Sequence, residues 1–294
     1  MSELSRRDLF KGAAGVAAMT ALGATSVQAA DDPNWKIKNG RINQSVVHWC
    51  FKPMTVEALA KSAAEMGVKS VELIGPEDWP TLKKYGLTCA IAGSHGFVKG
   101  FNDPANHDMC IEKIKKSVDA SAAFGCPNVI TFSGMREKIS DEEGLKNTID
   151  GLKKVIGYAE EKKITLCIEM LNSRVATEMK GHPGYMCDSL DWAMKVCKGV
   201  GSPRMKILFD IYHVQIMHGD IIQRVKECKD FIGHVHTAGN PGRAEIDESQ
   251  EINYPPIMKA LLDVGYSGFV GQEFIPVRED QIGSLRQGVR ICDV

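Results

Sequence analysis

The amino-acid sequence predicts a single (β/α)8 barrel domain, or TIM barrel. Short apolar runs alternate with longer amphipathic segments, and this alternation is typical of a parallel sheet covered by helices. Eight such units in the 264 residues of 31–294 match the usual barrel length of about 250 residues. A doubly wound open sheet is the rival fold, but residues 46–50 lack the glycine fingerprint that usually follows its first strand.

Eight segments are expected to form the strands of this barrel. Each is about five to eight residues long and rich in Val, Ile, Leu, Phe and Thr, as buried strands are. In chain order, the expected strands are 42–48, 69–73, 87–92, 128–132, 165–169, 206–210, 231–236 and 269–273.

The amphipathic segments between these runs are expected to form helices, and their ends carry capping signals. Thr55 is suited to cap a helix that starts beside it, and Asp-Glu-Glu at 141–143 suits the positive end of a helix dipole. Glycine, a common helix stop, directly follows three of the segments. In chain order, the expected helices are 55–66, 108–124, 141–163, 189–198, 221–229, 255–264 and 279–292.

Residues 1–30 are expected to be an export signal that does not belong to the fold. Arg6 and Arg7 precede an uncharged, Ala/Gly-rich stretch at 12–27, and small residues around 27–29 offer a cleavage site. The arginine pair resembles a twin-arginine (Tat) signal, which implies the Tat export machinery as a partner and a periplasmic or other extracytoplasmic location. An amphipathic or unstructured tail is the alternative interpretation.

Composition argues against several classes of partner and site. With 36 basic and 37 acidic residues the net charge is −1, which argues against a nucleic-acid partner. No run of about 18 apolar residues occurs, so no membrane span is expected in the mature form. The nine cysteines include no C-x-x-C pair, so neither a disulfide framework nor a cysteine zinc site is expected. A small-molecule substrate is the expected partner, and a homo-oligomer is left open.

Four successive expected strands end in a residue that can bind a metal ion. The separations along the chain are 41, 26 and 37 residues, each about one strand–helix unit long. The active sites of TIM barrels lie at the C-terminal face, where the strands end. These four side chains should therefore lie side by side around one half of the rim. The four residues are Glu169, Asp210, His236 and Glu273.

The two-residue period of a strand predicts which side chains face the barrel interior. Glu169 shares a face with Cys167, whereas the apolar neighbours on the other face suit the helix layer. Glu273 can point inward in the same way. His234 and His236 share a face, and His236 is nearer the rim, so we choose His236 as the ligand and place His234 one layer below.

Three carboxylates and one imidazole predict a single divalent cation, with Mg²⁺ or Mn²⁺ preferred and Co²⁺ or Zn²⁺ as alternatives. The competing interpretation is a set of surface charges or ion pairs of the barrel.

Around these residues the sequence resembles the hydroxypyruvate isomerase family of the xylose-isomerase-like barrel superfamily, which also contains ketose 3-epimerases and endonuclease IV. The resemblance covers most of 43–273 and is densest after residue 164. It is carried by the motifs EMLN at 169–172, DIYH at 210–213, GHVH at 233–236, NPGR at 240–243 and GQEF at 271–274.

The resemblance implies that Glu169, Asp210 and Glu273 bind metal together with a ligand from the seventh strand. Hydroxypyruvate isomerases of bacteria and plants often have glutamine at this fourth position, whereas the 3-epimerases have histidine. His236 stands there in this chain. It therefore strengthens the metal role and moves the expected substrate toward that of the epimerases.

Further residues are candidates for binding substrate. His213 follows Asp210 by three residues, and Arg243 follows the turn Asn-Pro-Gly, which would place a guanidinium over the barrel mouth to bind a carboxylate. His48 and His95 come just after the first and third strands and are further candidates, with a core or rim role as the alternative. Glu72, at the end of the second strand, is more simply a structural hydrogen-bonding residue.

The expected activity is a metal-dependent shift of a carbonyl on a small hydroxy-carbonyl compound, with hydroxypyruvate to tartronate semialdehyde as the named reaction. The metal would polarise the carbonyl and stabilise an enediolate, and Glu169 and Glu273 would be the acid–base pair. A ketose or keto-sugar 3-epimerase is the second hypothesis. A non-catalytic carbohydrate-binding barrel is the third.

Overall fold

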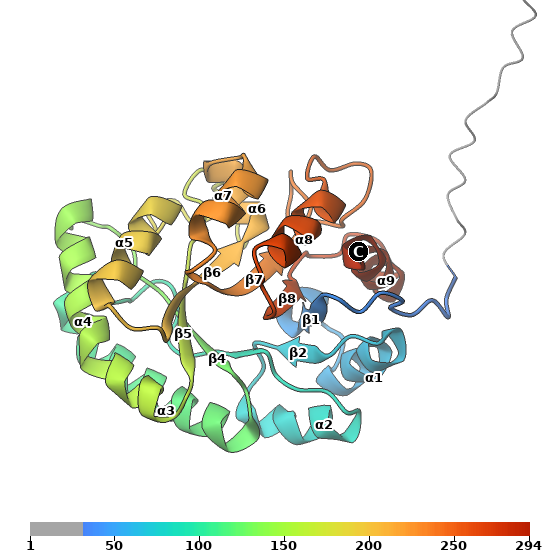
Figure 1. Cartoon of the computed structure of the whole chain (residues 1–294), viewed down its shortest axis with the longest axis horizontal. Helices are drawn as coiled ribbons and strands as arrows, with labels where there is room; N and C mark the ends of the chain where they lie inside the picture. The colour runs from blue at the N-terminus through green and yellow to red at the C-terminus, as the bar shows by residue number, and fades with distance from the viewer. Residues whose placement is uncertain (1–31) are drawn as a thin grey trace, which may run out of the picture. The chain divides into compact units, whose positions relative to one another are not determined.

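The computed structural model describes residues 32–294, and within it residues 33–294 form one compact unit (Figure 1). The expected export signal, residues 1–30, lies outside the described residues.

Eight parallel strands form a nearly closed barrel, which confirms the predicted fold class. Neighbouring strands follow the order β2-β1-β8-β7-β6-β5-β4-β3. Two backbone hydrogen bonds, each 3.2 Å long, complete the ring: Val71 N of β2 donates to Thr88 O in the segment before β3, and Leu73 N, just after β2, donates to Ile91 O of β3. The strands are β1 (Asn43–Val47), β2 (Ser70–Glu72), β3 (Ile91–Ala92), β4 (Asn128–Thr131), β5 (Thr165–Glu169), β6 (Met205–Asp210), β7 (Ile232–Thr237) and β8 (Phe269–Gln272).

The α-helices of the described chain lie outside the strands (Figure 1). The capping signals act as expected: the Thr55 side chain accepts a hydrogen bond from Ala58 N, and Gly67 ends its helix in the left-handed conformation at φ 86°. The helices are α1 (Val56–Met66), α2 (Trp79–Lys84), α3 (His107–Phe124), α4 (Asp141–Glu161), α5 (Leu190–Val200), α6 (Ile211–Met217), α7 (Ile221–Cys228), α8 (Tyr254–Asp263) and α9 (Gln281–Cys292).

Three elements differ from the expectation. The short helices α2 and α6 were not expected, because six or seven residues give too little periodicity to recognise. The third strand is only two residues long instead of the expected 87–92. The hydroxyl of Ser70 accepts the bond from Ala90 N, 2.8 Å away, so the backbone ladder is interrupted at that point.

The parallel arrangement brings the carboxyl ends of all strands to one face of the barrel. Charged and imidazole side chains at these ends are buried inside the mouth, although such groups are seldom buried without partners. None of the helices in the described part of the chain is long and apolar enough to cross a membrane.

Candidate active site

The four expected metal ligands converge at the mouth of the barrel. One ligand atom from each of Glu169, Asp210, His236 and Glu273 lies within 4.8 Å of the others, and all four residues are buried. They come from the ends of β5, β6 and β7 and from the residue that follows β8. We call these four residues the ligand cluster.

Asp210 is held by the helix that starts beside it. Its Oδ1 accepts hydrogen bonds from Tyr212 N at 2.8 Å and His213 N at 3.3 Å, so the carboxylate caps α6. Its other oxygen, Oδ2, is buried and has no hydrogen-bond partner among the described residues. The nearest nitrogens, Arg243 Nη2 and His213 Nε2, each lie 3.7 Å away. A buried carboxylate oxygen without a hydrogen bond is rare and favours an additional ligand at that position.

His236 presents one ring nitrogen to the ligand cluster and the other to the interior below it. Nδ1 lies 2.9 Å from Glu273 Oε2 and 3.8 Å from Glu169 Oε1. It is buried and makes no hydrogen bond of good geometry with the described residues. Nε2 lies 2.7 Å from Glu72 Oε1.

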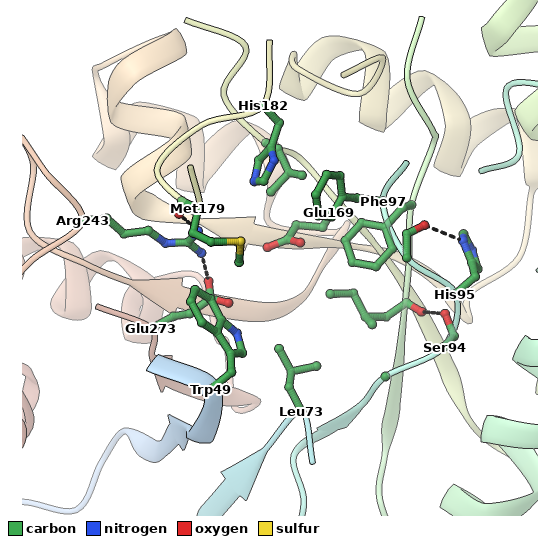
Figure 2. Close-up of a pocket in the computed structure, with 15 residues that line it drawn as sticks. Trp49, Leu73, Ser94, His95, Phe97, Glu169, Met179, His182, Arg243 and Glu273 are labelled. Carbon is green, nitrogen blue, oxygen red and sulfur yellow. Dashed lines mark hydrogen bonds and ion pairs between the residues drawn. The ribbon is translucent and has the colours of Figure 1, made fainter. Parts of the chain in front are cut away.

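Arg243 is buried against the ligand cluster, whereas the sequence suggested a guanidinium free to reach substrate over the mouth. Its Nη2 donates to Glu273 Oε2 at 2.6 Å, and its Nη1 donates to Met179 O at 2.6 Å (Figure 2). The guanidinium also lies over the rings of Trp49 and Tyr212, with distances of 5.2 and 5.8 Å to the ring centroids. The backbone of Arg243 has φ 54°, which turns the side chain into the mouth.

The carboxyl groups of the ligand cluster differ in the direction of their pKa shifts. Burial raises the pKa of Glu169, and burial together with the Glu273 carboxylate raises the pKa of Asp210 to about 8. Burial would also raise the pKa of Glu273, but the Arg243 guanidinium and the His236 imidazole hold it well below the ordinary value. The three carboxylates therefore share two counter-charges, the Arg243 guanidinium and the His236 imidazole.

The donor set fits a divalent cation. Three carboxylates and an imidazole are typical ligands for Mn²⁺ or Mg²⁺ and are also compatible with Zn²⁺ or Co²⁺. Asp210 Oδ2 and His236 Nδ1, which make no hydrogen bond with the described residues, both belong to residues of the ligand cluster. A cation would satisfy both atoms and reduce the repulsion among the carboxylates.

A cavity of about 310 Å³ opens beside the ligand cluster (Figure 2). Glu169, Glu273 and Arg243 border it at one end. Away from them, its wall is largely apolar and includes Phe97 and Phe132. A concave apolar site with a few polar groups at one end is the usual form of a small-molecule site.

His95 lines this cavity as expected, but both of its nitrogens are occupied. Nδ1 lies within 3.1–3.2 Å of the carbonyl oxygens of Gly96 and Lys99, and Nε2 lies 2.9 Å from the Thr131 hydroxyl. The ring therefore shapes the wall and offers no free nitrogen to a substrate.

The structure does not place His213 or His48 on the cavity wall. His213 is fully buried, and its Nδ1 accepts a hydrogen bond from Asn172 N at 3.0 Å. Burial lowers the pKa of His213 well below its ordinary value, so the ring is neutral. His48 bonds through Nε2 to Met54 O at 2.8 Å, and the adjacent Trp49 lines the cavity instead.

His182 lines the cavity and was missed by the sequence analysis. Its ring packs on Phe97 with centroids 4.4 Å apart, and burial lowers its pKa to about 4. A neutral imidazole at this position can exchange a hydrogen bond with a substrate hydroxyl. The sequence feature that could have indicated His182 is the long segment 170–189 between β5 and α5, because long connections in compact domains often carry function.

The burial of Arg243 predicts a large effect on stability. Arg243→Gln should lower the free energy of unfolding by about 3–5 kcal/mol in a metal-free buffer, because it leaves the Glu273 carboxylate buried without its counter-charge. Adding Mn²⁺ should reduce the deficit, since the cation supplies positive charge. Urea denaturation with and without Mn²⁺ measures both effects.

Arg278 provides the matched control for this substitution. It pairs with Asp247 and has a side chain that is 41% exposed, so Arg278→Gln should cost at most about 1 kcal/mol. Equal losses for the two variants would contradict the charge balance described for the ligand cluster.

Comparison with known proteins gives two family matches. Residues 60–292 match the family described as xylose isomerase-like TIM barrel. Residues 3–23 match the twin-arginine translocation pathway signal sequence.

Individual proteins of known name are similar over most of the barrel. A Homo sapiens protein named "Putative hydroxypyruvate isomerase" is 28% identical over 79% of this chain and 78% of its own length. The 2-oxo-tetronate isomerase of Pectobacterium atrosepticum is 30% identical over 76% of this chain and 88% of its own length. Among solved structures, an AP endonuclease of family 2 from Brucella melitensis superposes with a TM-score of 0.74 at 24% identity, covering 84% of this chain and 97% of that one.

Proposed function

The chain belongs to the xylose isomerase-like TIM barrel family as an enzyme of the sugar or hydroxy-acid isomerase type, and from this premise we propose that it moves a proton beside a substrate carbonyl at the ligand cluster. The observation that carries the proposal is the placement of Glu169 and Glu273. Their carboxylates border the same cavity and adjoin the same candidate cation position.

The two glutamates are proposed to form the acid–base pair. In this scheme one carboxylate takes the proton from the carbon next to the carbonyl, and the other returns a proton. Return to the neighbouring carbon gives an isomer, and return to the opposite face of the same carbon gives an epimer. A divalent cation held by Glu169, Asp210, His236 and Glu273 would polarise the carbonyl.

Arg243 is proposed to support this pair in two ways. Its bond to Glu273 Oε2 fixes the direction of that carboxylate. It is also the one cationic side chain among the described residues that line the cavity, so its positive charge would attract an acidic substrate. His182 is proposed as a hydrogen-bonding partner for a substrate hydroxyl.

Hydroxypyruvate, converted to tartronate semialdehyde, is the named substrate of the proposal. Similarity to proteins named hydroxypyruvate isomerase and 2-oxo-tetronate isomerase supports a short hydroxy-keto acid. The second candidate activity is a ketose or keto-sugar 3-epimerase, which His236 and the size of the cavity favour. A volume of about 310 Å³ corresponds to about ten water molecules, more than a three-carbon acid needs. Similarity to named isomerases argues against a non-catalytic carbohydrate-binding barrel.

The test is direct conversion by the mature protein loaded with Mn²⁺ or Mg²⁺. Hydroxypyruvate, 2-oxo-tetronate and a set of neutral ketoses are incubated separately, and products are identified by NMR. The proposal expects a product from at least one of these classes. Conversion of ketoses without conversion of the acids would select the epimerase form.

We also propose that the mature enzyme acts in the periplasm or another extracytoplasmic space. The Tat signal match supports export of this chain by the twin-arginine route. Replacing Arg6 and Arg7 together with lysine should block export, and the full-length precursor should accumulate in the cytoplasmic fraction on a Western blot. Normal export of the parent chain in a Tat-deficient host would contradict the route.

A further inference from the structure

We infer that Glu72, supported by His234, is a positioning residue that fixes the proton of His236 on Nε2 and so leaves Nδ1 free to bind the cation. The inference rests on the cation site of the proposed function and assigns a role to a buried carboxylate that the proposed reaction does not use.

Glu72 reaches His236 across the inside of the barrel. It ends β2, and in the sheet order β1 and β8 separate that strand from β7. Its Oε1 nevertheless lies 2.7 Å from His236 Nε2 and 2.9 Å from His234 Nε2. All three side chains are fully buried, so no solvent competes for these contacts.

The chemistry of these contacts assigns the protons. An ionised carboxylate only accepts hydrogen bonds, so each Nε2 within reach of Oε1 must carry the hydrogen. Nδ1 lies beside Glu273 and Glu169 but makes no hydrogen bond of good geometry with either, so a cation can take the place of hydrogen on that atom while Nε2 keeps its own. Histidine ligands usually donate their other ring N–H to a carboxylate or carbonyl in this way.

Gly271 makes the contact possible. It lies on β8, directly opposite His236 of β7 in the sheet register, and β8 together with β1 separates β7 from the strand of Glu72. A Cβ atom at this position would lie 2.5 Å from Glu72 Oε1 and 2.9 Å from His236 Cδ2. Any larger side chain would thus displace the carboxylate or the imidazole, so this strand is open where the two meet.

His234 fixes Glu72 from a second direction. Both imidazoles bond to the same oxygen, while Glu72 Oε2 and His234 Nδ1 have no hydrogen-bond partner among the described residues. The rings of His234 and His236 are nearly perpendicular, with centroids 4.9 Å apart. The carboxylate is therefore held in one orientation by the two donors.

The experiment measures Mn²⁺ affinity by electron paramagnetic resonance of the free ion. Glu72→Gln removes the charge, and Glu72→Asp keeps the charge but withdraws it by one methylene. Each should weaken Mn²⁺ binding by about 10–100-fold, the usual effect of removing a partner of a metal-binding histidine. Glu245→Gln is the matched control: Glu245 is also buried and hydrogen-bonded, to Val277 N, Arg278 N and the Ser284 hydroxyl, and its substitution should leave Mn²⁺ affinity unchanged.

NMR of ¹⁵N-histidine-labelled protein with Mg²⁺ bound reads the proton position directly, and His236→Gln assigns the signal. The parent should show His236 with hydrogen on Nε2 and none on Nδ1. Hydrogen on Nδ1 would overturn the inference even if the Glu72 variants fail to fold, and so would parent-like Mn²⁺ affinity in a folded variant. A second bound equivalent of Mn²⁺ that disappears in Glu72→Gln would also overturn it, because Glu72, His234 and His236 would then be ligands themselves. A parent protein that binds no cation would instead refute the cation site of the proposed function.

Discussion

Replacing Glu169 or Glu273 with glutamine is expected to lower turnover by about 10²–10⁴-fold or more, because general acid–base catalysis typically contributes that much. Glutamine preserves the shape of the side chain but cannot accept the substrate proton. The loss should be greater where the variant also binds the cation more weakly. Substrate affinity should fall much less, since Trp49, Phe97 and His182 still line the cavity.

Steady-state kinetics and direct substrate-binding measurements on both variants separate these effects. Glu245→Gln, at a buried carboxylate outside the ligand cluster, is the control and should retain parent-like turnover. Near-parent turnover in both Glu169→Gln and Glu273→Gln, with the cation bound, would refute the assigned pair.

Removal of the Asp210 carboxylate is expected to abolish stoichiometric cation binding while the barrel still folds. Asp210 belongs to the ligand cluster; its Oδ2 makes no hydrogen bond with the described residues, whereas its Oδ1 caps α6. Asp210→Ala should therefore lose both functions, with a cost of about 1 kcal/mol from the lost cap. Asp210→Asn should lose the cation but keep most of the capping energy, because asparagine is an equally good N-cap residue.

Elemental analysis after dialysis measures the amount of bound cation per protein. Urea denaturation in a metal-free buffer measures the free energy of unfolding that the cap contributes. Full cation occupancy in Asp210→Ala would show that Asp210 is not a ligand. Equal unfolding free energies for the alanine and asparagine variants would show that its Oδ1 does not stabilise α6.

The convergence of the ligand cluster could be predicted from the sequence because two simple periods determine it. The two-residue period of a strand selects the face of Glu169 and His236, and the length of a strand–helix unit places successive strand ends on one rim. Neither argument requires side-chain conformations, and the structure brings the four residues within 4.8 Å of one another.

The positions of the candidate substrate-binding residues were harder to predict because loops place them. Arg243 is turned into the mouth by its left-handed backbone and is bonded to Glu273 and Met179, and no sequence period describes such a turn. His48 and His213 are close in sequence to strand ends but bond to Met54 O and Asn172 N instead. The role of Glu72 likewise depends on a contact across the barrel.

The family resemblance seen in the sequence motifs is confirmed by the match over 60–292, and the Tat signal by the match over 3–23. The barrel match defines the fold, and similarity to named isomerases supports the enzyme type. The substrate depends on the cavity wall, where Phe97 and His182 come from connections between elements rather than from the barrel strands. Such connections vary more among relatives than the elements they join.

The central claim is that the ligand cluster moves a proton on substrate carbon, and hydrogen exchange tests it most directly. The Mn²⁺- or Mg²⁺-loaded protein is incubated in D₂O with each candidate substrate, and carbon-bound deuterium is measured by NMR and mass spectrometry. The account predicts deuterium at the carbon next to the carbonyl of at least one substrate, with slower incorporation in Glu169→Gln and Glu273→Gln. A cation-loaded protein that binds these compounds yet exchanges no carbon-bound hydrogen would contradict the account.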